Sequence, residues 1–406
     1  MQVAFVSGAH PSCNPRLLRC ARQLAGWGHQ VNVFHPVTDT ALYSEDLELA
    51  AAGGWRSQVY FDWSHGPSRF RARLLRKLAS RAARWGVQSI HALGYGIAEL
   101  SRRLGEIRGH GLVIGQQEVG LWTAVQCLGD TRVWVDIEDW YSRDLPDAAR
   151  SGRPLSLLTR LESTALSRAD WCTTTSSALA EALSRTYDSP IPGVIYNLSH
   201  CSELPPWDGR YRDRASADRV SLHWFSQTLG PHRGLEVLFQ AATRVPEDFE
   251  IHLRGRLQSQ SWFDQVLPSE LRDRVHLHPC VPNAELHTRI CEHDIGLALE
   301  APFCDSRNLT ITNKLFAYLQ AGLRVIATRT SGQLEILGDR QDLGETVAAD
   351  DPDALAQAMT RMIQSHPNRS ALPEPLPAWC WEDHKPLVAE RLEAWFPEAG
   401  PGEAAP

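Results

Sequence analysis

The chain has 406 residues, of which 43% are hydrophobic and 22% charged, and a formal net charge of −7. This length predicts two domains of roughly 200 residues each. The acidic balance excludes general nucleic-acid binding, because a surface that follows phosphates carries excess positive charge. The sequence shows neither a membrane-spanning run nor a signal peptide, and its nine cysteines lack a C-x-x-C pair. We therefore expect reduced thiols in a cytoplasmic protein.

The first half alternates short apolar runs with helical patterns. A buried strand is predicted at Val3–Val6, and a helix with Leu17 and Leu24 on its apolar face follows. Later strands are predicted at Val31–Phe34, Ser89–His91, Leu112–Ile114, Val133–Val135, Ala169–Thr175 and Val194–Tyr196. This alternation predicts a parallel sheet covered by helices on both faces.

A polar segment, residues 201–218, predicts a linker between a first domain, 1–200, and a second domain, 219–375. The second domain repeats the same alternation. Its strands are predicted at Val220–Phe225, Glu250–Leu253, Val275–His278, Ile295–Ala298, Val325–Ala327 and Thr346–Ala348. Residues 376–398 predict a last helix, and 399–406 a disordered tail.

The segment Ser68–Trp85 predicts a basic amphipathic helix. It contains no acid and seven cations, which are Arg69, Arg71, Arg73, Arg76, Lys77, Arg81 and Arg84. Its apolar residues fall at helical spacing and are Phe70, Leu74, Leu78, Ala82 and Trp85. Two interpretations remain open: the apolar face packs on the domain, or the helix makes a peripheral contact with an anionic membrane surface.

The stretch from Thr310 to Ala327 predicts a loop, a helix, a glycine stop and a buried strand. Thr312 or Asn313 can cap this helix, and Lys314 stands in its first turn, where the helix dipole disfavours a cation. A bound anion would explain the lysine, because a helix N-terminus is a ready phosphate site. An ordinary capped helix with an exposed lysine is the alternative.

Two more loops of the second half follow predicted strands. Their glycines allow close backbone approach, and their arginines can offer planar donor groups to a diphosphate. The candidates are Ser226, Gly230, Arg233, Gly234, Arg254 and Gly255. Ligands of open α/β sheets bind outside the carboxyl ends of the strands, so we expect these loops and Lys314 to line one crevice.

An acidic loop follows the strand Val133–Val135 in the first half. Asp136, Glu138 and Asp139 would repel one another unless they bind something or titrate unusually. Helix capping and ordinary surface acids are the alternative. In the first loop of the chain, His10 could orient an acceptor hydroxyl.

Taken in order, these motifs resemble those of family 4 glycosyltransferases with the GT-B fold, over nearly the whole chain. The matching segments are Asn14–Arg16 with Gly28–Val31, Asp136–Ser142, Ser226–Glu236, Asn313–Ile326 and Trp381–Glu382. The resemblance implies two Rossmann-like parallel-sheet domains that face each other across a cleft. It also implies sugar transfer from a nucleotide-diphosphate sugar to an acceptor, with retention of anomeric configuration and without a metal or cofactor.

The resemblance also assigns roles to individual residues. It implies catalytic roles for Arg233, Lys314, Glu138 and Asp139, the first two through contact with the donor diphosphate. Donor contacts are expected from Ser226, Gly230, Gly234, Arg254, Gly255, Glu300, Thr312 and Asn313. Acceptor contacts are expected from Gly8, His10 and Asp136, and the acceptor is a glycan, a lipid-linked molecule or a small molecule.

One departure from the family pattern concerns ribose binding. Many members carry two glutamates separated by seven intervening residues, and these positions fall on Leu309 and Ala317 here. Glu300, at the end of the adjacent strand, is the candidate replacement. The departure keeps a non-catalytic GT-B binding subunit open as an alternative, beside a sugar-nucleotide epimerase.

Overall fold

The computed structural model describes residues 1–64, 68–214, 218–365 and 379–397, so the predicted tail at 399–406 lies outside the described residues. The chain divides into two compact units. Unit 1 comprises Met1–Tyr196, Cys304–Ser306 and the C-terminal segment from His384, and unit 2 comprises Asn197–Phe303 and Arg307–Asp383.

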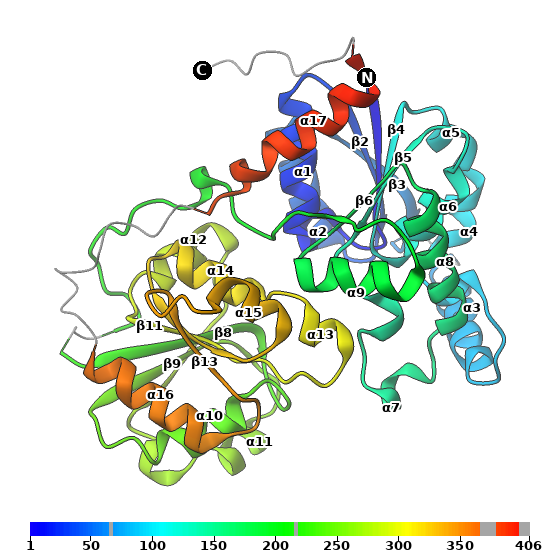
Figure 1. Ribbon diagram of the computed structural model, residues 1–406. Coiled ribbons are helices and arrows are strands. Elements are labelled where there is room, and N and C mark those ends of the chain that lie inside the picture. The colour runs from blue at the N-terminus through cyan, green and yellow to red at the C-terminus, as the bar shows by residue number, and fades with distance from the viewer. Residues whose placement is uncertain (65–67, 215–217, 366–378, 398–406) are drawn as a thin grey trace. The chain divides into compact units, whose positions relative to one another are not determined.

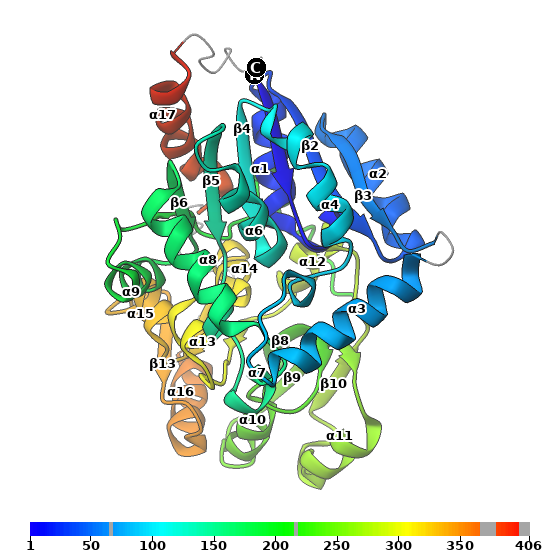
Figure 2. The same cartoon turned by 90° about the vertical axis from the view of Figure 1, so that its right-hand side faces the viewer.

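Unit 1 is built on a seven-stranded, all-parallel sheet with the order β3-β2-β1-β4-β5-β6-β7. Its strands are β1 (Gln2–Val6), β2 (Gln30–Val37), β3 (Arg56–Asp62), β4 (Leu112–Gln116), β5 (Arg132–Ile137), β6 (Trp171–Thr174) and β7 (Gly193–Val194). Helices lie on both sides of the sheet (Figures 1 and 2). They are α1 (Pro15–Gly26), α2 (Thr40–Gly53), α3 (Ser68–Ala83), α4 (Ile97–Arg102), α5 (Leu104–Arg108), α6 (Gln117–Cys127), α7 (Asp147–Arg150), α8 (Leu155–Arg168), α9 (Ser177–Tyr187) and α17 (Lys385–Trp395).

The first β–α unit shows how the sequence determines these elements. Strand β1 is buried from Val3 to Val6, as a central parallel strand requires. Helix α1 begins where the Asn14 side chain accepts a hydrogen bond from the Leu17 N–H at 3.0 Å. After the helix, Gly28 adopts φ +83°, a left-handed conformation that turns the chain toward β2.

Unit 1 differs from the prediction in two details. Ser89–His91 was expected as a strand, but a 3-10 helix runs from Ile90 to Ala92, and the Ser89 hydroxyl caps it by accepting from the His91 N–H at 3.3 Å. Strand β3 was not predicted. This strand lies at the edge of the sheet and is mostly half-buried. Its first residues are polar, so the sequence lacks the apolar run or alternation that indicates a strand.

Unit 2 is built on a six-stranded, all-parallel sheet with the order β10-β9-β8-β11-β12-β13. Its strands are β8 (Val220–Leu229), β9 (Phe249–Leu257), β10 (Val275–His278), β11 (Ile295–Ala298), β12 (Arg324–Thr328) and β13 (Gly344–Val347). Its helices are α10 (Leu235–Ala242), α11 (Gln260–Val266), α12 (Asn283–Ile290), α13 (Asp305–Leu309), α14 (Asn313–Gln320), α15 (Ser331–Leu337) and α16 (Pro352–Gln364). Both sheets reverse their strand order at the first strand, which is the topology of a Rossmann-like domain.

Buried histidines form a row across the sheet of unit 2. His223 of β8 pairs in register with His252 of β9, which pairs in register with His276 of β10. The His223 ring stacks on His293, with ring centroids 4.2 Å apart and an interplanar angle of 5°. His223, His252 and His293 are buried. The packing of this part of unit 2 therefore requires uncharged imidazoles.

A disulfide joins Cys201 to Cys380, whose Cα atoms lie 5.4 Å apart. The expectation that every thiol is reduced is wrong for this pair. The chain entering unit 2 runs beside the chain leaving it, since the Trp381 N–H donates to the Ser199 carbonyl at 2.9 Å. The sequence could not show this contact, because the two cysteines are 179 residues apart.

The last described helix, α17, belongs to unit 1, where Trp395 lies 6.4 Å from Trp171 between ring centroids. It is shorter than the segment 376–398 predicted for it, of which 376–378 and 398 lie outside the described residues. Among the described helices, none is long and apolar enough to cross a lipid bilayer.

Candidate functional site

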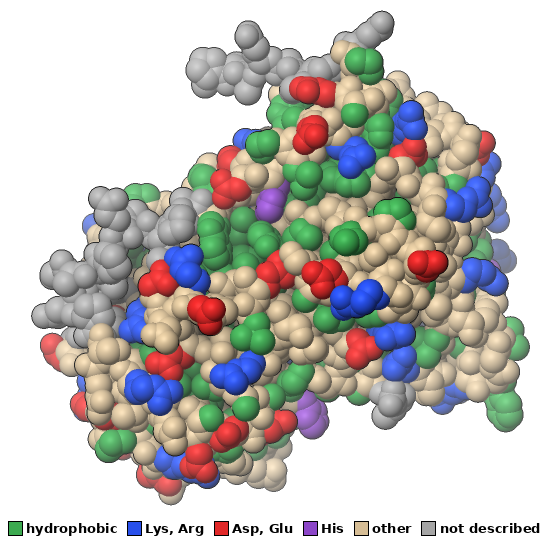
Figure 3. All heavy atoms as spheres, viewed as in Figure 1, with side chains coloured by type: hydrophobic (Ala, Val, Ile, Leu, Met, Phe, Trp, Pro, Cys, Tyr) green, Lys and Arg blue, Asp and Glu red, His purple; other side chains and the backbone are tan. Residues whose placement is uncertain are grey.

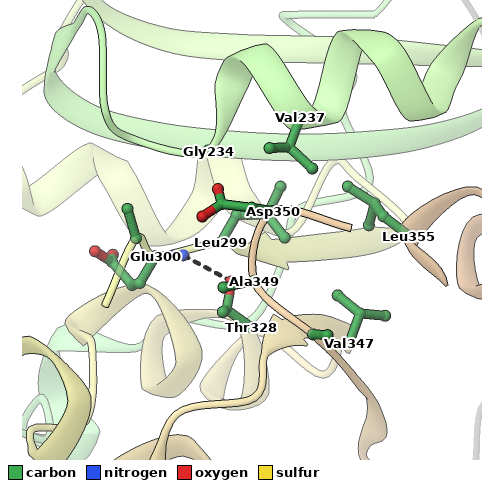
Figure 4. Close-up of a pocket in the computed structure, with 11 residues that line it drawn as sticks. Gly234, Val237, Leu299, Glu300, Thr328, Val347, Ala349, Asp350 and Leu355 are labelled. Carbon is green, nitrogen blue, oxygen red and sulfur yellow. Dashed lines mark hydrogen bonds between the residues drawn. The ribbon is translucent and has the colours of Figure 1, made fainter. Parts of the chain in front are cut away.

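A pocket lies in unit 2 at the carboxyl ends of β11, β12 and β13, beside the start of α10 and next to the switch point of the sheet between β8 and β11 (Figure 4). Ligands of such sheets bind outside the carboxyl ends of the strands at this point. Two carboxylates, Glu300 and Asp350, are among its lining residues. The full lining is Gly234, Val237, Leu299, Glu300, Ala301, Thr328, Val347, Ala348, Ala349, Asp350 and Leu355.

Gly234 brings the start of α10 against the end of β11. Its φ is +81°, and a Cβ there would lie 2.9 Å from the Cβ of Leu299. Only glycine fits this conformation and this contact without strain. The free backbone N–H groups of the first turn of α10 therefore lie close to the pocket.

Lys314 is fixed by a carboxylate of the pocket. Its Nζ bonds Glu300 Oε1, and the same oxygen accepts a hydrogen bond from the Thr312 hydroxyl at 3.0 Å. The ammonium also lies 5.3 Å from the ring centroid of Trp224, within the range of a cation–π contact. The Glu300 backbone N–H donates to the Thr328 hydroxyl at 3.0 Å, as Figure 4 shows. The lysine is thus half of an anchored ion pair at the start of α14, not a freely solvated side chain.

The charges of this group are set by its surroundings. Burial would raise the pKa of the Glu300 carboxyl, but the Lys314 ammonium outweighs burial and holds that pKa below its usual value. Arg307, which sequence reasoning missed, lies 4.0 Å from Glu300 Oε2. Nothing in its local sequence distinguishes Arg307. Two cations and two helix N-termini together can stabilise an anionic group such as a diphosphate.

The ends of β8 and β9 hold a second group. Arg233 is exposed, and its Nη1 donates to the Ser226 hydroxyl at 2.9 Å. Gly255 has φ +155°, and a Cβ there would lie 2.4 Å from the Ser226 carbonyl oxygen. Close approach of the two strands therefore requires glycine. At Gly230 a Cβ would meet only the flexible end of the Gln258 side chain.

Two residues that were expected to contact the donor, Arg254 and Asn313, bond other residues of unit 2. Arg254 is buried, ion-paired with Asp213, and donates to the Pro279 carbonyl at 2.8 Å. In the structure this arginine therefore contributes to the packing of unit 2. Asn313 is exposed, and its side-chain oxygen accepts a hydrogen bond from Asn197 at 2.9 Å.

Unit 1 has its own switch point, between β1 and β4. Gly8 lies there, and its N–H donates to the Gln117 side-chain oxygen at 3.1 Å. Gln117 has φ +59°, an uncommon conformation for a residue other than glycine, and its N–H donates to the Tyr141 hydroxyl at 3.1 Å. Such strain collects at functional sites, so Gln117 is a site candidate that sequence reasoning missed. The residues around Gln117 give no indication of this backbone conformation.

Asp136 and His10, the expected acceptor contacts, are both held by other side chains and backbone groups of unit 1. Asp136 is buried and accepts from Arg16 Nε at 2.6 Å and Nη2 at 2.7 Å, as well as from Gln116 and Thr173. The buried His10 ring bonds Asp46 through Nδ1 at 2.6 Å, and its Nε2 accepts two backbone N–H groups at 2.9 and 3.1 Å. Both residues are saturated by protein partners, so they position the loop after β1 and the end of β5.

Glu138 has a strongly raised pKa. Burial, followed by the nearby Asp136 carboxylate, raises the pKa of Glu138 to about 7, although Asn14 donates to its Oε1 at 2.9 Å. A carboxyl with this pKa can give or take a proton near neutral pH. Asp139, the other predicted catalytic acid, is exposed beside it.

A stability measurement tests this assignment. The folded pKa of Glu138 lies above its unfolded value, so ionisation costs the native state stability as pH rises through about 7. Glu138→Gln is therefore expected to raise the free energy of unfolding by about 2 kcal/mol at pH 8 and to have little effect at pH 5. Urea denaturation at both pH values measures this, with Glu48→Gln on the surface of α2 as control. Equal effects at both pH values would contradict the raised pKa.

The comparisons with known proteins agree with this architecture. Residues 222–365, which include Gly234, Glu300 and Lys314, match the model of the family described as Glycosyl transferases group 1. No curated protein matches the sequence. Among solved structures, a sucrose-phosphate synthase from Thermosynechococcus elongatus has a TM-score of 0.70 at 16% identity, with 98% of this chain and 99% of that chain covered.

Two further solved structures are similar over their whole length. An Anabaena protein in complex with UDP-glucose has a TM-score of 0.63 at 14% identity, with 97% of this chain and 100% of that chain covered. A glycosyltransferase from Rickettsia africae has a TM-score of 0.59 at 14% identity, with 98% of both chains covered. The predicted fold class is confirmed: two Rossmann-like domains with parallel sheets, as in GT-B proteins.

Proposed function

We propose that this protein is a glycosyltransferase that takes a sugar from a nucleotide-diphosphate donor held by unit 2, with retention of anomeric configuration. The family match over residues 222–365 and the solved glycosyltransferase structures support the general activity. The observation that carries the proposal is the Lys314–Glu300 pair, which lies at the switch point of the sheet and at the start of α14. An anion-binding group in this position fits a diphosphate.

The chemistry requires stabilisation of the leaving group. Negative charge grows on the nucleoside diphosphate as the bond to the sugar breaks. Fixed cations at Lys314 and Arg233, aided by the N–H groups at the starts of α10 and α14, stabilise that charge more than they stabilise the ground state. Glu300 holds the ammonium of Lys314 in place, so this part of the site is ordered before the donor binds.

The pocket also contains carboxylates that could take the place of the absent family glutamate. Glu300 and Asp350 both line it, and carboxylate oxygens can accept hydrogen bonds from the hydroxyls of a ribose. They would replace the glutamate that is absent at Ala317. The Anabaena structure with UDP-glucose supports a nucleoside diphosphate sugar as donor. In unit 1, Glu138 and the strained Gln117 loop would act on a hydroxyl-bearing acceptor.

Calorimetry with UDP, GDP and ADP, followed by a donor screen that measures nucleotide release with and without acceptors, tests the proposal. We expect one nucleotide to bind and its sugar donor to be consumed in the presence of an acceptor. Binding without any turnover would instead favour a non-catalytic binding subunit, the alternative that Ala317 motivates. An epimerised donor formed without acceptor would identify an epimerase. Absence of all nucleotide binding would overturn the proposed donor site.

We also expect the reaction to proceed without a divalent metal, because Lys314, Arg233 and the helix N-termini supply positive charge where the diphosphate leaves. Three groups of His, Cys or carboxylate side chains among the described residues lie close enough to hold an ion, and none includes Glu300 or Asp350. Activity measured in excess EDTA should match activity in buffer alone. Loss of activity in EDTA, restored by Mg²⁺ or Mn²⁺, would contradict this expectation.

A further inference from the structure

Exposed apolar side chains are concentrated on helix α3 and on the segment that directly follows it. Within the part of the chain that the structure describes, six of the eleven exposed large hydrophobic residues fall between positions 70 and 87, and they are Phe70, Leu74, Leu75, Leu78, Trp85 and Val87. Phe70 is 72% exposed, Leu74 57% and Trp85 87%. Isolated exposed hydrophobic residues are ordinary, but a contiguous group marks an interaction surface.

The helix presents its large apolar side chains outward. At about 100° per residue, Phe70, Leu74 and Leu78 fall on one side of the helix, and with the exposed Trp85 of the turn that follows it they form a ridge. The opposite side carries Ala79, which is buried, with Ala72 and Ala83, which are half-buried. The interpretation in which the apolar face packs on the domain is therefore wrong: small alanines make that contact, and the ridge remains exposed.

Cations divide between the two sides of the helix. Arg69 and Arg73 lie 5.4 and 4.6 Å from the ring centroid of Trp63, and Arg76 lies 4.4 Å from that of Tyr95. These stacked arginines hold α3 to unit 1. The remaining four cations are exposed and flank the ridge, and they are Arg71, Lys77, Arg81 and Arg84. Where Figure 1 places α3, Figure 3 shows blue and green side chains together at the right-hand edge.

From this arrangement we propose that the outer face of α3 docks on an anionic phospholipid surface. The apolar ridge enters the boundary between headgroups and acyl chains, where tryptophan is favoured, and the flanking cations bind the headgroup phosphates. Charge selects this occupant, because residues 68–85 carry seven cations and no acid in a chain of net charge −7. A second copy of the same face would bring like charges together, and nucleic acid offers nothing for the ridge.

Vesicle co-sedimentation tests the proposal without any transfer assay, so its result is independent of the proposed catalytic function. The wild-type protein is expected to bind phosphatidylcholine vesicles that contain about 30% phosphatidylglycerol, and to bind pure phosphatidylcholine weakly. Arg71→Glu/Lys77→Glu/Arg81→Glu should weaken binding by about 100-fold at low salt. Phe70→Ser/Leu74→Ser/Trp85→Ser should weaken it by about 10-fold or more at any salt concentration.

Matched controls place the same changes elsewhere on unit 1. Arg102→Glu/Arg160→Glu/Arg168→Glu reverses three other exposed cations, and Leu47→Ser/Ile191→Ser removes exposed apolar side chains outside α3. All five forms are checked for folding by circular dichroism. The proposal is overturned if wild type does not bind anionic vesicles, or if the controls lose as much binding as the α3 variants. A wild-type dimer that the ridge variant converts to monomer, without vesicle binding, would identify a second copy as the occupant.

Discussion

Replacing Lys314 by alanine is expected to lower turnover by about 100-fold or more, the scale on which a single preorganised charge-stabilising group acts. The lysine is half of the Lys314–Glu300 pair, and its ammonium is fixed before the donor arrives. Arg233→Ala is expected to have an effect of the same order, because its exposed guanidinium lies beside Ser226 at the end of β8. Initial rates of nucleotide release at saturating donor and acceptor measure both.

The two variants separate loss of chemistry from loss of folding. Lys314 is buried and its removal perturbs Glu300, whereas Arg233 is exposed and can be truncated without disturbing the core. Arg244→Ala is the matched control, since this exposed arginine follows the far end of α10 and pairs with Asp353. Thermal unfolding is measured for each variant. Near-normal turnover in folded Lys314→Ala and Arg233→Ala would remove the diphosphate assignment.

Mild acid is expected to destabilise unit 2 strongly. Burial, followed by neighbouring His252, lowers the pKa of His223 well below its usual value, and burial, followed by His276, lowers the pKa of His252 to about 3. Burial and the adjacent His223 lower the pKa of His293 in the same direction. Below about pH 6.5 these imidazoles are protonated in the unfolded chain but stay neutral in the native state. The free energy of unfolding therefore decreases as pH falls toward the native pKa values. Each imidazole should cost about 2 kcal/mol at pH 5 relative to pH 7.5.

Urea denaturation at pH 7.5 and pH 5 measures this loss. His223→Phe keeps an aromatic ring beside Phe225 and removes one titrating group, so its stability should depend less on pH than that of wild type. His232→Asn changes an exposed histidine whose φ of +61° asparagine tolerates, and it should leave the dependence unchanged. Equal stability of the wild type at both pH values would contradict the expected destabilisation by the buried histidines.

Apolar periodicity and capping residues in the sequence predicted the helices and strands that depend on nearby residues. The period of the apolar residues located α14 and β12, and the predicted cap Thr312 stands at the start of α14, because these signals act within a few residues. A lysine in the first turn of a helix pointed to the pocket. Its partner Glu300 was foreseen only as a nearby candidate, since the ion pair depends on how β11 ends.

The failures concern contacts between distant segments. The sequence does not show the partners of His10 and Asp136. They come from the segment after β2 and from α1, α2, β4 and β6, and they saturate the hydrogen bonds of both side chains. Helix α3 was also ambiguous, because its periodicity shows that one side is apolar and cannot show which side meets the domain. The alanine side makes that contact, and no rule based on hydrophobicity alone selects it.

The Cys201–Cys380 bond has a consequence for how unit 2 responds to a protease. Every strand of the second sheet lies between these two cysteines, so the bond closes the unit into a covalent ring. A single cut in any of its surface loops opens the ring without releasing a fragment. The nicked protein would migrate as one species on a non-reducing gel and separate into two pieces only after reduction. Because the cut ends stay tethered at high effective concentration, the severed strands can return to the same sheet.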